Sequence, residues 1–377
     1  MAELGLFVRI GACKFSRDNG SIALSTGTNN EPAVQVSGAA VAELSGRSRL
    51  GTLPGIRILG TGSYLPSRRV VNDELAALGC DSQWIVQRTG ILERRRAAED
   101  QATSDLAYEA AIDCLRKAGV APRDVDLLIV ATITPDHATP STACHVQRRL
   151  GCICPAMDVN AACAGFMYAA LTASQFIANG MAKRALVIGA EVMSRTVNPR
   201  DVKTFPLFGD GAGAALLGPA DGDLQGWLSF TLGAEGCGGQ LLCVPSGGSR
   251  HPLSSESIAA GEHYMRMEGR QVFKWAVRIV ADSCRDCLIY SGKDIAEVDA
   301  LILHQANIRI IDSAVADLGI DRDKVLVNLD RYGNTSAASI PIALDEAIAG
   351  GTLAPGSLAL LCGFGSGLAW GTGLLQM

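Results

Sequence analysis

The chain has 377 residues, of which 48% are hydrophobic and 19% are charged, and its formal net charge is -5. This length predicts two domains or two similar halves, and the composition excludes a disordered or collagen-like chain. The negative charge argues against nonspecific nucleic-acid binding, whose affinity comes mainly from neutralising phosphates. Twelve cysteines are too few for a disulfide-stapled scaffold of this length, so we expect a reducing compartment.

Residues 1–54 are predicted to be an N-terminal extension, because they show little sustained periodicity and are rich in Ser, Gly, Asn and Thr. No uninterrupted apolar core follows a basic start, which disfavours a secretory signal. We expect a nonessential extension or a start site placed too early, and therefore a cytoplasmic protein. The alternative is a transit peptide and a plastid location, although acidic residues such as Glu3 and Glu43 are unusual in transit peptides.

From residue 55 onward, apolar runs typical of strands alternate with helical runs. We predict a strand at 55–62, a helix ending near Leu78, a helix at 105–120 and a strand at 125–133. This alternation predicts mixed α/β layers.

An internal repeat divides the rest of the chain. Each copy reads as a helix, a glycine stop, a short loop and an apolar strand, and a second helix–strand unit follows each copy. At one constant offset, Cys114-Leu115 matches Cys287-Leu288, Gly119 matches Gly292, Val125-Asp126 matches Val298-Asp299, and Leu128-Ile129 matches Leu301-Ile302. We expect homologous halves at 55–225 and 226–377, whose pseudo-twofold packing brings two helix N-termini toward a central site.

Residues 347–377 carry no charge, which meets the length criterion for a membrane span. Several glycines and Pro355 interrupt the stretch. We therefore predict two buried strands joined by a glycine-rich turn, and no membrane insertion.

Three chemically capable residues lie at predicted strand–helix junctions. Cys163 lies in AACAGF, where a helix N-terminus favours a thiolate and small neighbours leave room for a substrate. His304 ends the apolar run VDALILH, and Asn334 lies in RYGNTSAAS, where its ordinary role would be a turn or N-cap residue. Together they suggest a nucleophile with two polar stabilisers. A cysteine protease is the competing interpretation.

Over roughly residues 55–373 the sequence resembles the thiolase-fold condensing enzymes, and most closely the β-ketoacyl-acyl carrier protein synthase III family. The motifs that carry the resemblance are GTGSYLP, WIVQRTGILERR, ATITPDHATPSTA, DVNAACAGF, FGDGAGAALLG, MEGRQVFK, LHQANIRI, RYGNTSAAS and GFGSGLAWG. The resemblance implies an α/β thiolase fold, in which the duplicated halves form a five-layered αβαβα architecture.

The resemblance also implies a mechanism. Cys163 takes an acyl group from coenzyme A, and the backbone N–H groups of Cys163 and Ser366 hold the tetrahedral oxyanion. His304 and Asn334 then donate hydrogen bonds to the thioester oxygen of malonyl-acyl carrier protein. Carbon dioxide leaves, and the resulting carbanion attacks the acylated Cys163 in a decarboxylating Claisen condensation.

Asn334 separates this chain from related condensing enzymes. Elongating synthases resemble it but carry a second histidine at this position, and thiolases carry a Gly-His-Pro motif where this chain has GNTSAAS. Thiolases also use a late cysteine as acid and base, and Cys362 lies near that position. Because its histidine partner is missing, we interpret Cys362 as a buried strand residue.

The family's binding residues map onto further positions. Coenzyme A is assigned to Trp84, Arg88, Gly269 and Asn307, the acyl pocket to Thr139, Met193 and Phe208, and acyl carrier protein docking to Lys274, Arg309 and Arg270. In many relatives that take short starters, an aromatic residue at the position of Thr139 closes the tunnel from the partner subunit. The smaller Thr139 is expected to admit a longer acyl group. Val202 stands where the family has a second adenine-clamping arginine.

We therefore predict a homodimeric acyltransferase that initiates type II fatty acid synthesis, with acyl-CoA and malonyl-acyl carrier protein as partners and with neither a metal nor a cofactor. A CxxC pair at Cys284 and Cys287 has no second pair at zinc-binding spacing. The alternatives are a divergent acyltransferase, a polyketide-priming enzyme, or a noncatalytic acyl-thioester-binding module.

Overall fold

A computed structural model describes residues 21–22, 36–37, 49–220, 222 and 225–377, so most of the predicted extension lies outside the described residues. Within the described residues, two sheets of five strands dominate, in the orders β4-β10-β9-β7-β8 and β14-β15-β16-β11-β3. The first sheet contains β4 (Ile56–Tyr64), β7 (Leu127–Ala131), β8 (Ala156–Val159), β9 (Ala185–Val192) and β10 (Asp210–Pro219). The second contains β3 (Leu50–Pro54), β11 (Gly226–Ala234), β14 (Ala300–Leu303), β15 (Leu358–Gly365) and β16 (Ala369–Gln376).

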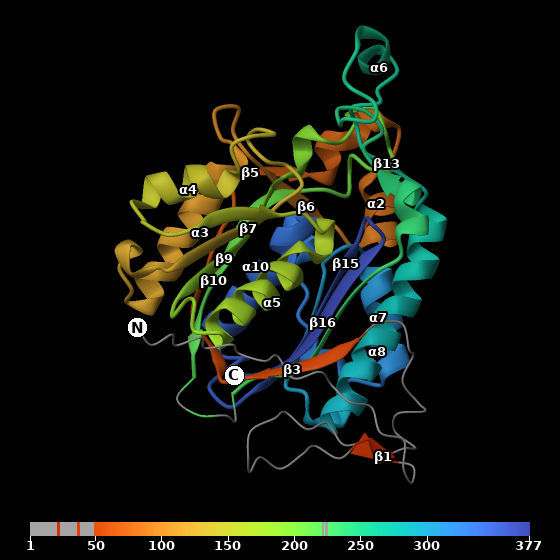
Figure 1. The fold of residues 1–377 in the computed structure, drawn as a ribbon. Helices are drawn as coiled ribbons and strands as arrows, with labels where there is room; N and C mark the ends of the chain where they lie inside the picture. The colour runs from red at the N-terminus through yellow and green to blue at the C-terminus, as the bar shows by residue number, and fades with distance from the viewer. Residues whose placement is uncertain (1–20, 23–35, 38–48, 221, 223–224) are drawn as a thin grey trace.

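Helices cover both faces of each sheet. The helices are α2 (Ser82–Thr89), α3 (Thr103–Ala118), α4 (Thr142–Leu150), α5 (Gly165–Ala178), α6 (Ser255–Ala259), α7 (Gly269–Ser291), α8 (Ile308–Leu318), α9 (Leu329–Tyr332) and α10 (Ser339–Ala349). Figure 1 shows α3 and α4 outside the first sheet, α5 and α10 between the sheets, and α7 and α8 outside the second. This order gives the five predicted αβαβα layers.

The described residues also form three short strand pairs outside the two large sheets. They are β1 (Ser21–Ile22) with β2 (Val36–Ser37), β5 (Arg68–Val71) with β6 (Glu93–Arg96), and β12 (Leu242–Cys243) with β13 (Arg266–Met267). The helix predicted to end near Leu78 is a 3₁₀ helix, Asn72–Leu78.

The predicted duplication is visible strand by strand. Counted along the sheets, β4, β10, β9 and β7 correspond to β11, β16, β15 and β14. Where the first sheet adds β8, the second has only an isolated parallel bridge between Leu301 and Val325. The matched glycines Gly119 and Gly292 end α3 and α7 in the left-handed conformation, at φ 65° and 66°, which L-residues rarely adopt.

The predicted boundary at residue 225 falls between β10 and β11. Leu50–Pro54, which the prediction assigned to the extension, instead forms β3 and pairs with β11 at the edge of the second sheet.

The C-terminal segment folds as predicted. β15 and β16 pair from Leu358 with Gln376 to Gly365 with Ala369, and both strands are almost wholly buried. Apolar side chains on both faces of these strands are explained by helices on either side of the sheet. Within the described residues, no helix is both long and apolar enough to cross a membrane.

Candidate active site

One cavity of about 1190 Å³ collects the predicted catalytic residues from both halves of the chain. Cys163 enters its wall from the first half, and His304 and Asn334 from the second. A parallel bridge between Phe208 and Asn334 joins the halves beside the cavity. The backbone N–H of Asn334 donates a hydrogen bond to the carbonyl oxygen of Leu207 over 2.8 Å.

Cys163 lies in a 3₁₀ turn, Ala162–Ala164, directly before α5. The backbone of Gly365 packs so closely on it that an added Cβ would come within 2.8 Å of the Cβ of Cys163, so this position requires glycine. Ser366, the predicted second oxyanion residue, follows immediately and lines the same cavity. Its φ is not positive, because Ala162 and Ser336 are the described non-glycine residues with positive φ.

The electrostatics of Cys163 differ from the sequence-based expectation. Burial raises the pKa of Cys163 to about 12, the Ser336 hydroxyl acts in the opposite direction, and the charge of Glu191 raises the pKa further. Burial therefore opposes the thiolate that the sequence predicted and favours a neutral thiol in the free protein. The thiol needs a proton acceptor when it attacks.

His304 directly follows β14, and its backbone N–H donates to the carbonyl oxygen of Cys362 over 2.8 Å. Nδ1 of the ring lies 2.7 Å from Oγ of Ser339, and the ring packs edge-on against Phe364. Burial lowers the pKa of His304 to about 3. The imidazole is therefore neutral near pH 7.

The orientation of the Asn334 amide follows from its neighbour. The backbone N–H of Ser336 donates to Oδ1 of Asn334 over 2.8 Å. Because an N–H group can only donate, the atom facing it is the amide oxygen. The Nδ2 donor is left free for a substrate oxygen in the cavity.

A buried carboxylate supports this loop. Glu191, at the end of β9, accepts hydrogen bonds from Oγ1 of Thr134 at 2.7 Å and from Oγ of Ser336 at 3.0 Å. Burial raises the pKa of Glu191 to about 7, although these hydrogen bonds act in the opposite direction. Sequence analysis did not single out Glu191 or Ser336. The signal for Glu191 was a lone charge at the end of the apolar run ALVIGAE.

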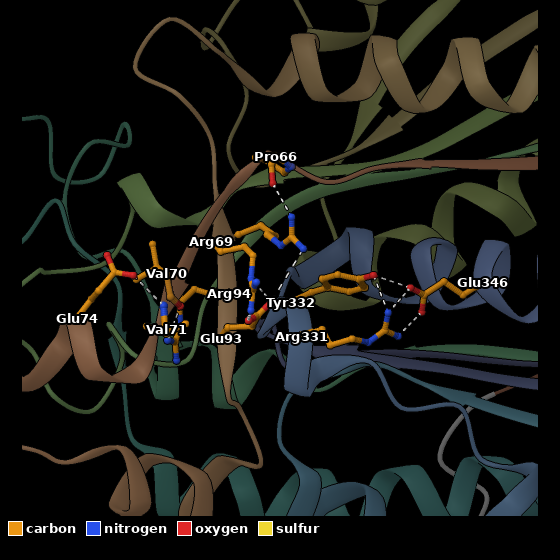
Figure 2. A network of polar contacts seen from close by, with 11 residues as sticks. Pro66, Arg69, Val70, Val71, Glu74, Glu93, Arg94, Arg331, Tyr332 and Glu346 are labelled. Carbon is orange, nitrogen blue, oxygen red and sulfur yellow. Dashed lines mark hydrogen bonds and ion pairs between the residues drawn. The ribbon is translucent and has the colours of Figure 1, made fainter.

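Arg94 is a second buried support that sequence analysis missed. Its guanidinium donates to the carbonyl oxygens of Val70 and Pro206 and to Oδ1 of Asn72, at 2.7 to 3.0 Å. Figure 2 shows Arg94 beside Val70. Pro206 lines the cavity. Arg94 therefore ties the β5–β6 region to the cavity wall.

The residues predicted to bind coenzyme A meet on the cavity wall. Trp84 and Arg88 lie on α2, with the guanidinium carbon of Arg88 4.1 Å from the centre of the indole ring. Gly269, the first residue of α7, also lines the cavity. Val202 packs in the same apolar cluster as Trp84, so an apolar contact replaces the expected second arginine.

Asn307 lines the cavity, but its side chain already has partners. Nδ2 donates to the carbonyl oxygen of Arg88 over 2.9 Å, and Oδ1 accepts from the N–H of Arg309 over 2.9 Å. In this arrangement Asn307 caps α8 and ties it to α2.

The predicted acyl-pocket residues divide into two groups. Met193 and Phe208 are buried, lie in one apolar cluster and line the cavity. Thr139 is exposed on the loop before α4 and lies outside its own chain's cavity wall. Its predicted place in the tunnel of a partner subunit stays a prediction.

The predicted docking residues are exposed. Arg270 and Lys274 lie one turn apart on α7, and the guanidinium of Arg309 on α8 lies 5.5 Å from the ring centre of Phe273. Arg270 and Arg309 line the cavity, whereas Lys274 lies beyond its wall.

Three cysteines of the second half are buried in secondary structure. Cys362 is buried in β15 and accepts a hydrogen bond from Oγ1 of Thr372, which confirms its interpretation as a buried strand residue. Cys284 and Cys287 are buried on α7. Across the described part of the chain, no group of three or more His, Cys, Asp or Glu residues could hold a metal ion.

Comparisons with known proteins agree with this architecture. The family model for 3-oxoacyl-(acyl-carrier-protein) synthase III matches residues 157–236, and the model for its C-terminal part matches residues 289–377. A β-ketoacyl-(acyl-carrier-protein) synthase III of Rhodopirellula baltica is 58% identical over 344 residues, which cover 87% of this chain and 100% of the relative.

Solved structures give the same result. The crystal structure of 3-oxoacyl-(acyl-carrier-protein) synthase III from Aquifex aeolicus is 43% identical with a TM-score of 0.78, covering 86% of this chain and 100% of that one. A priming β-ketosynthase from a polyketide biosynthetic pathway is 34% identical with a TM-score of 0.79, covering 87% and 98%. In each case the similarity extends over both halves.

Proposed function

The chain belongs to the 3-oxoacyl-(acyl-carrier-protein) synthase III family, and from this premise we propose that it catalyses the initiating condensation of type II fatty acid synthesis. An acyl group moves from coenzyme A to Cys163. Decarboxylative condensation with malonyl-acyl carrier protein then gives β-ketoacyl-acyl carrier protein, coenzyme A and carbon dioxide. The chain is thus an acyltransferase.

The meeting of three residues in one cavity carries this proposal. Cys163, His304 and Asn334 come from distant parts of the chain and line the same space. They supply a nucleophile, a neutral imidazole and a fixed amide donor. The apolar Met193 and Phe208 offer a surface to an acyl chain, as a hydrophobic substrate pocket requires.

Acylation requires the thioester to lie between the sulfur and hydrogen-bond donors. We assign the oxyanion hole to the backbone N–H groups of Cys163 and Ser366, which are close because Gly365 lies against Cys163. Such donors stabilise the tetrahedral intermediate because they point in advance at the charge that develops. Trp84, Arg88 and Gly269 would hold the coenzyme A portion at the cavity entrance. Asn307 would shape that entrance by joining α8 to α2.

Condensation requires donors for an enolate. His304 and Asn334 would hold the thioester oxygen of the malonyl group while carbon dioxide leaves, and the carbanion would then attack the acyl group on Cys163. Loss of carbon dioxide drives this step, so the chemistry needs only side chains, backbone N–H groups and the two thioesters.

The same proposal includes the carrier protein and a second copy of the chain as partners. Arg270, Lys274 and Arg309 form a basic surface beside the cavity, which suits an acidic carrier protein. We further propose a homodimer, in which Thr139 reaches the partner's tunnel, and a cytoplasmic location.

The test offers the purified protein a series of acyl-CoA thioesters with and without malonyl-acyl carrier protein. Mass spectrometry follows the acyl group on Cys163 and the carrier product, and Cys163→Ala serves as the control. We expect cysteine-dependent acylation followed by a β-ketoacyl-carrier product. Acylation without condensation would favour a thioester-binding module, and no acylation would refute the catalytic assignment.

The similarity to a polyketide-priming ketosynthase makes that role the second candidate. The same assay separates the two with carrier proteins of both pathways. Turnover only with a polyketide carrier would replace the fatty-acid assignment.

A further inference from the structure

A hydroxyl group joins the turn that carries the second oxyanion donor to another part of the cavity wall. This turn, residues 366–368, connects β15 to β16. Oγ of Ser366 donates a hydrogen bond to the carbonyl oxygen of Leu242, the first residue of β12. Ser366 and Leu242 both line the cavity, so this bond links two segments of one wall that are far apart in the sequence.

The turn lies directly beside Cys163. A Cβ built on Gly365 would come within 3.0 Å of the backbone nitrogen of Cys163 and within 3.1 Å of its Sγ. The backbone nitrogen of Ser366 follows Gly365 across one peptide bond. A movement of the turn therefore shifts this N–H relative to the sulfur and to a thioester bound there.

The far end of the turn is fixed by backbone bonds. The N–H of Leu368 donates to the carbonyl oxygen of Glu235 over 3.1 Å, and the N–H of Glu235 donates to the carbonyl oxygen of Leu368 over 2.7 Å. Leu368 is 2% exposed and packs on Gly238, where an added Cβ would lie 2.6 Å from its Cδ1. At the near end, where the oxyanion N–H lies, the tie is the side chain of Ser366.

The acceptor of this tie belongs to the surface that an acyl chain would contact. Leu242 is buried and packs in one apolar cluster with Met193, Phe208 and Met265, and all four residues line the cavity. Leu242 therefore contacts the acyl pocket with its side chain and the oxyanion turn with its carbonyl oxygen.

We propose that Ser366 is a positioning residue that couples the acyl pocket to the oxyanion turn, so that an acyl chain lying against Leu242 helps to hold the backbone N–H of Ser366 at the thioester oxygen. The hydroxyl itself does not touch the reacting atoms. This inference rests on the proposed function and deepens it, because it names a residue that determines which acyl groups react fastest.

The coupling should affect the rate of acylation more than binding. An oxyanion donor stabilises charge that develops only as the tetrahedral intermediate forms, so its alignment acts on the rate and not on the KM. Contacts made by a remote part of a substrate raise the rate when they orient the reacting groups. A long acyl chain that reaches Leu242 should gain from the tie, whereas an acetyl group, which ends close to the sulfur, should gain little.

The variant Ser366→Ala removes the hydroxyl and retains the backbone N–H. For the longest acyl-CoA that the wild-type protein accepts, we expect acylation of Cys163 at saturation to slow by about 10- to 100-fold, the scale expected for a misplaced catalytic group. Acetyl-CoA should react less than about threefold more slowly, because it makes no remote contact. The KM values should stay as they are, and Ser366→Thr, which keeps a hydroxyl, should restore the wild-type preference.

A matched control separates this coupling from a general loss of stability. Ser229 in β11 also donates through its hydroxyl to a backbone carbonyl, that of Cys287, over 2.7 Å. It is 0% exposed and lies outside the cavity wall. Ser229→Ala should lower stability and leave the ratio of long-chain to acetyl rates unchanged.

Two kinetic results would overturn the inference. The first is an equal loss for long-chain and acetyl thioesters in Ser366→Ala, because a disturbed fold lowers all rates alike. The second is a wild-type protein that accepts acetyl-CoA only, because no acyl chain would then reach Leu242.

Hydrogen exchange tests the tie without any enzymatic activity. In the intact free protein, mass spectrometry follows amide exchange in peptides that cover residues 366–368. Exchange there should be about five- to tenfold faster in Ser366→Ala, as expected for the loss of one hydrogen bond, and unchanged in Ser229→Ala. Unchanged exchange in Ser366→Ala would show that the hydroxyl does not hold the turn.

These readouts distinguish failure of the inference from failure of the proposed function. A wild-type protein that takes no acyl group from any thioester would refute the proposed function, and the coupling to acylation with it, even if exchange in the turn is faster in Ser366→Ala. A wild-type protein that is acylated, with a chain-length preference that Ser366→Ala leaves unchanged, would refute the role of Ser366 alone.

Discussion

The hydroxyl of Ser336 donates to Oε1 of Glu191 over 3.0 Å, which links a buried carboxylate to the loop that carries Asn334. Ser336 has a φ of +50°, a left-handed conformation that costs energy in a non-glycine residue. Its N–H fixes the amide of Asn334, and its carbonyl accepts from Ser339. Ser336 therefore holds the asparagine, and through Ser339 the histidine, in place.

Glu191 and His304 should give the protein opposing pH dependences. Burial raises the pKa of Glu191 to about 7, from 4.5, and lowers the pKa of His304 to about 3, from 6.5. Between pH 4.5 and 6.5, folded Glu191 keeps a proton that the unfolded chain releases, whereas unfolded His304 binds a proton that the folded chain lacks. The two contributions to the free energy of unfolding therefore cancel in this window.

Single substitutions should reveal how Glu191 and His304 each contribute to the pH dependence of the free energy of unfolding. In His304→Ala, the free energy of unfolding should fall by roughly 3 kcal/mol, relative to wild type, as pH rises from 4.5 to 7. In Glu191→Gln it should instead fall as pH drops below 6.5. Urea denaturation at several pH values measures both, and parallel curves for the two variants would contradict the prediction.

Cys163 should react slowly with alkylating agents in the free protein. Because burial raises the pKa of Cys163 to about 12, its thiolate fraction, and with it the alkylation rate, should rise about tenfold per pH unit between pH 7 and 10. The exposed Cys144 and Cys237 serve as internal references in the same mass spectra. A rate for Cys163 that is flat over this range would indicate a thiolate already formed.

The sequence predicted those features that depend on short local motifs. Cys163 and His304 each lie between a strand and a helix, as predicted, whereas Asn334 lies between α9 and the 3₁₀ turn before α10, so its predicted strand–helix junction is wrong. The repeated Gly119 and Gly292 correctly marked equivalent helix ends. The family, the thiolase fold and the acyltransferase class are confirmed by the comparisons. The assignments of individual site residues remain proposals.

What the sequence could not reveal depends on contacts between distant segments. The pKa of Cys163 depends on how completely strands and helices far away in the chain desolvate it, which no motif encodes. Ser339 contacts His304 because α10 begins beside β14, and the amide of Asn307 is engaged because α8 lies against α2. β3 was missed because an edge strand is recognised by its pairing with β11, and its own five residues are only partly apolar.

Asn334 should be required for condensation and not for acylation. Asn334→Ala removes the Nδ2 donor, and the loss of one such donor typically lowers the rate by about 10²- to 10³-fold. Release of carbon dioxide from malonyl-acyl carrier protein should show this loss, while acylation of Cys163 in the same protein provides the control. An equal loss in both half-reactions would show that the variant has disturbed the whole site.

Charge reversal on the basic surface should weaken carrier docking. Lys274→Glu or Arg309→Glu should raise the KM for malonyl-acyl carrier protein roughly fivefold, about 1 kcal/mol for one exposed ion pair. The difference should shrink at high salt because exposed charges are screened. Arg123→Glu, on an exposed turn outside the cavity wall, is the matched control, and an equal effect there would refute a local docking site.

Arg94 and Arg69 offer a matched test of buried and exposed charge, because both belong to the β5–β6 pair (Figure 2). Arg94 is 0% exposed and donates to three uncharged acceptors, whereas the Arg69 side chain is 60% exposed and pairs with Glu93. Arg94→Met would leave the carbonyl oxygens of Val70 and Pro206 without this donor. It should therefore lower the free energy of unfolding by about 3 to 5 kcal/mol.

Arg69→Met should cost less than about 1 kcal/mol, because water replaces an exposed ion pair easily. Since Pro206 lies two residues before Phe208 on the cavity wall, Arg94→Met should also change the preference among acyl-CoA chain lengths, measured by competition between thioesters for Cys163. Arg69→Met should leave that preference as it is. If both variants lost the same stability and kept the same preference, Arg94 could not be a support of the acyl pocket, and the wall would be held by the apolar packing around Met193 and Phe208 alone.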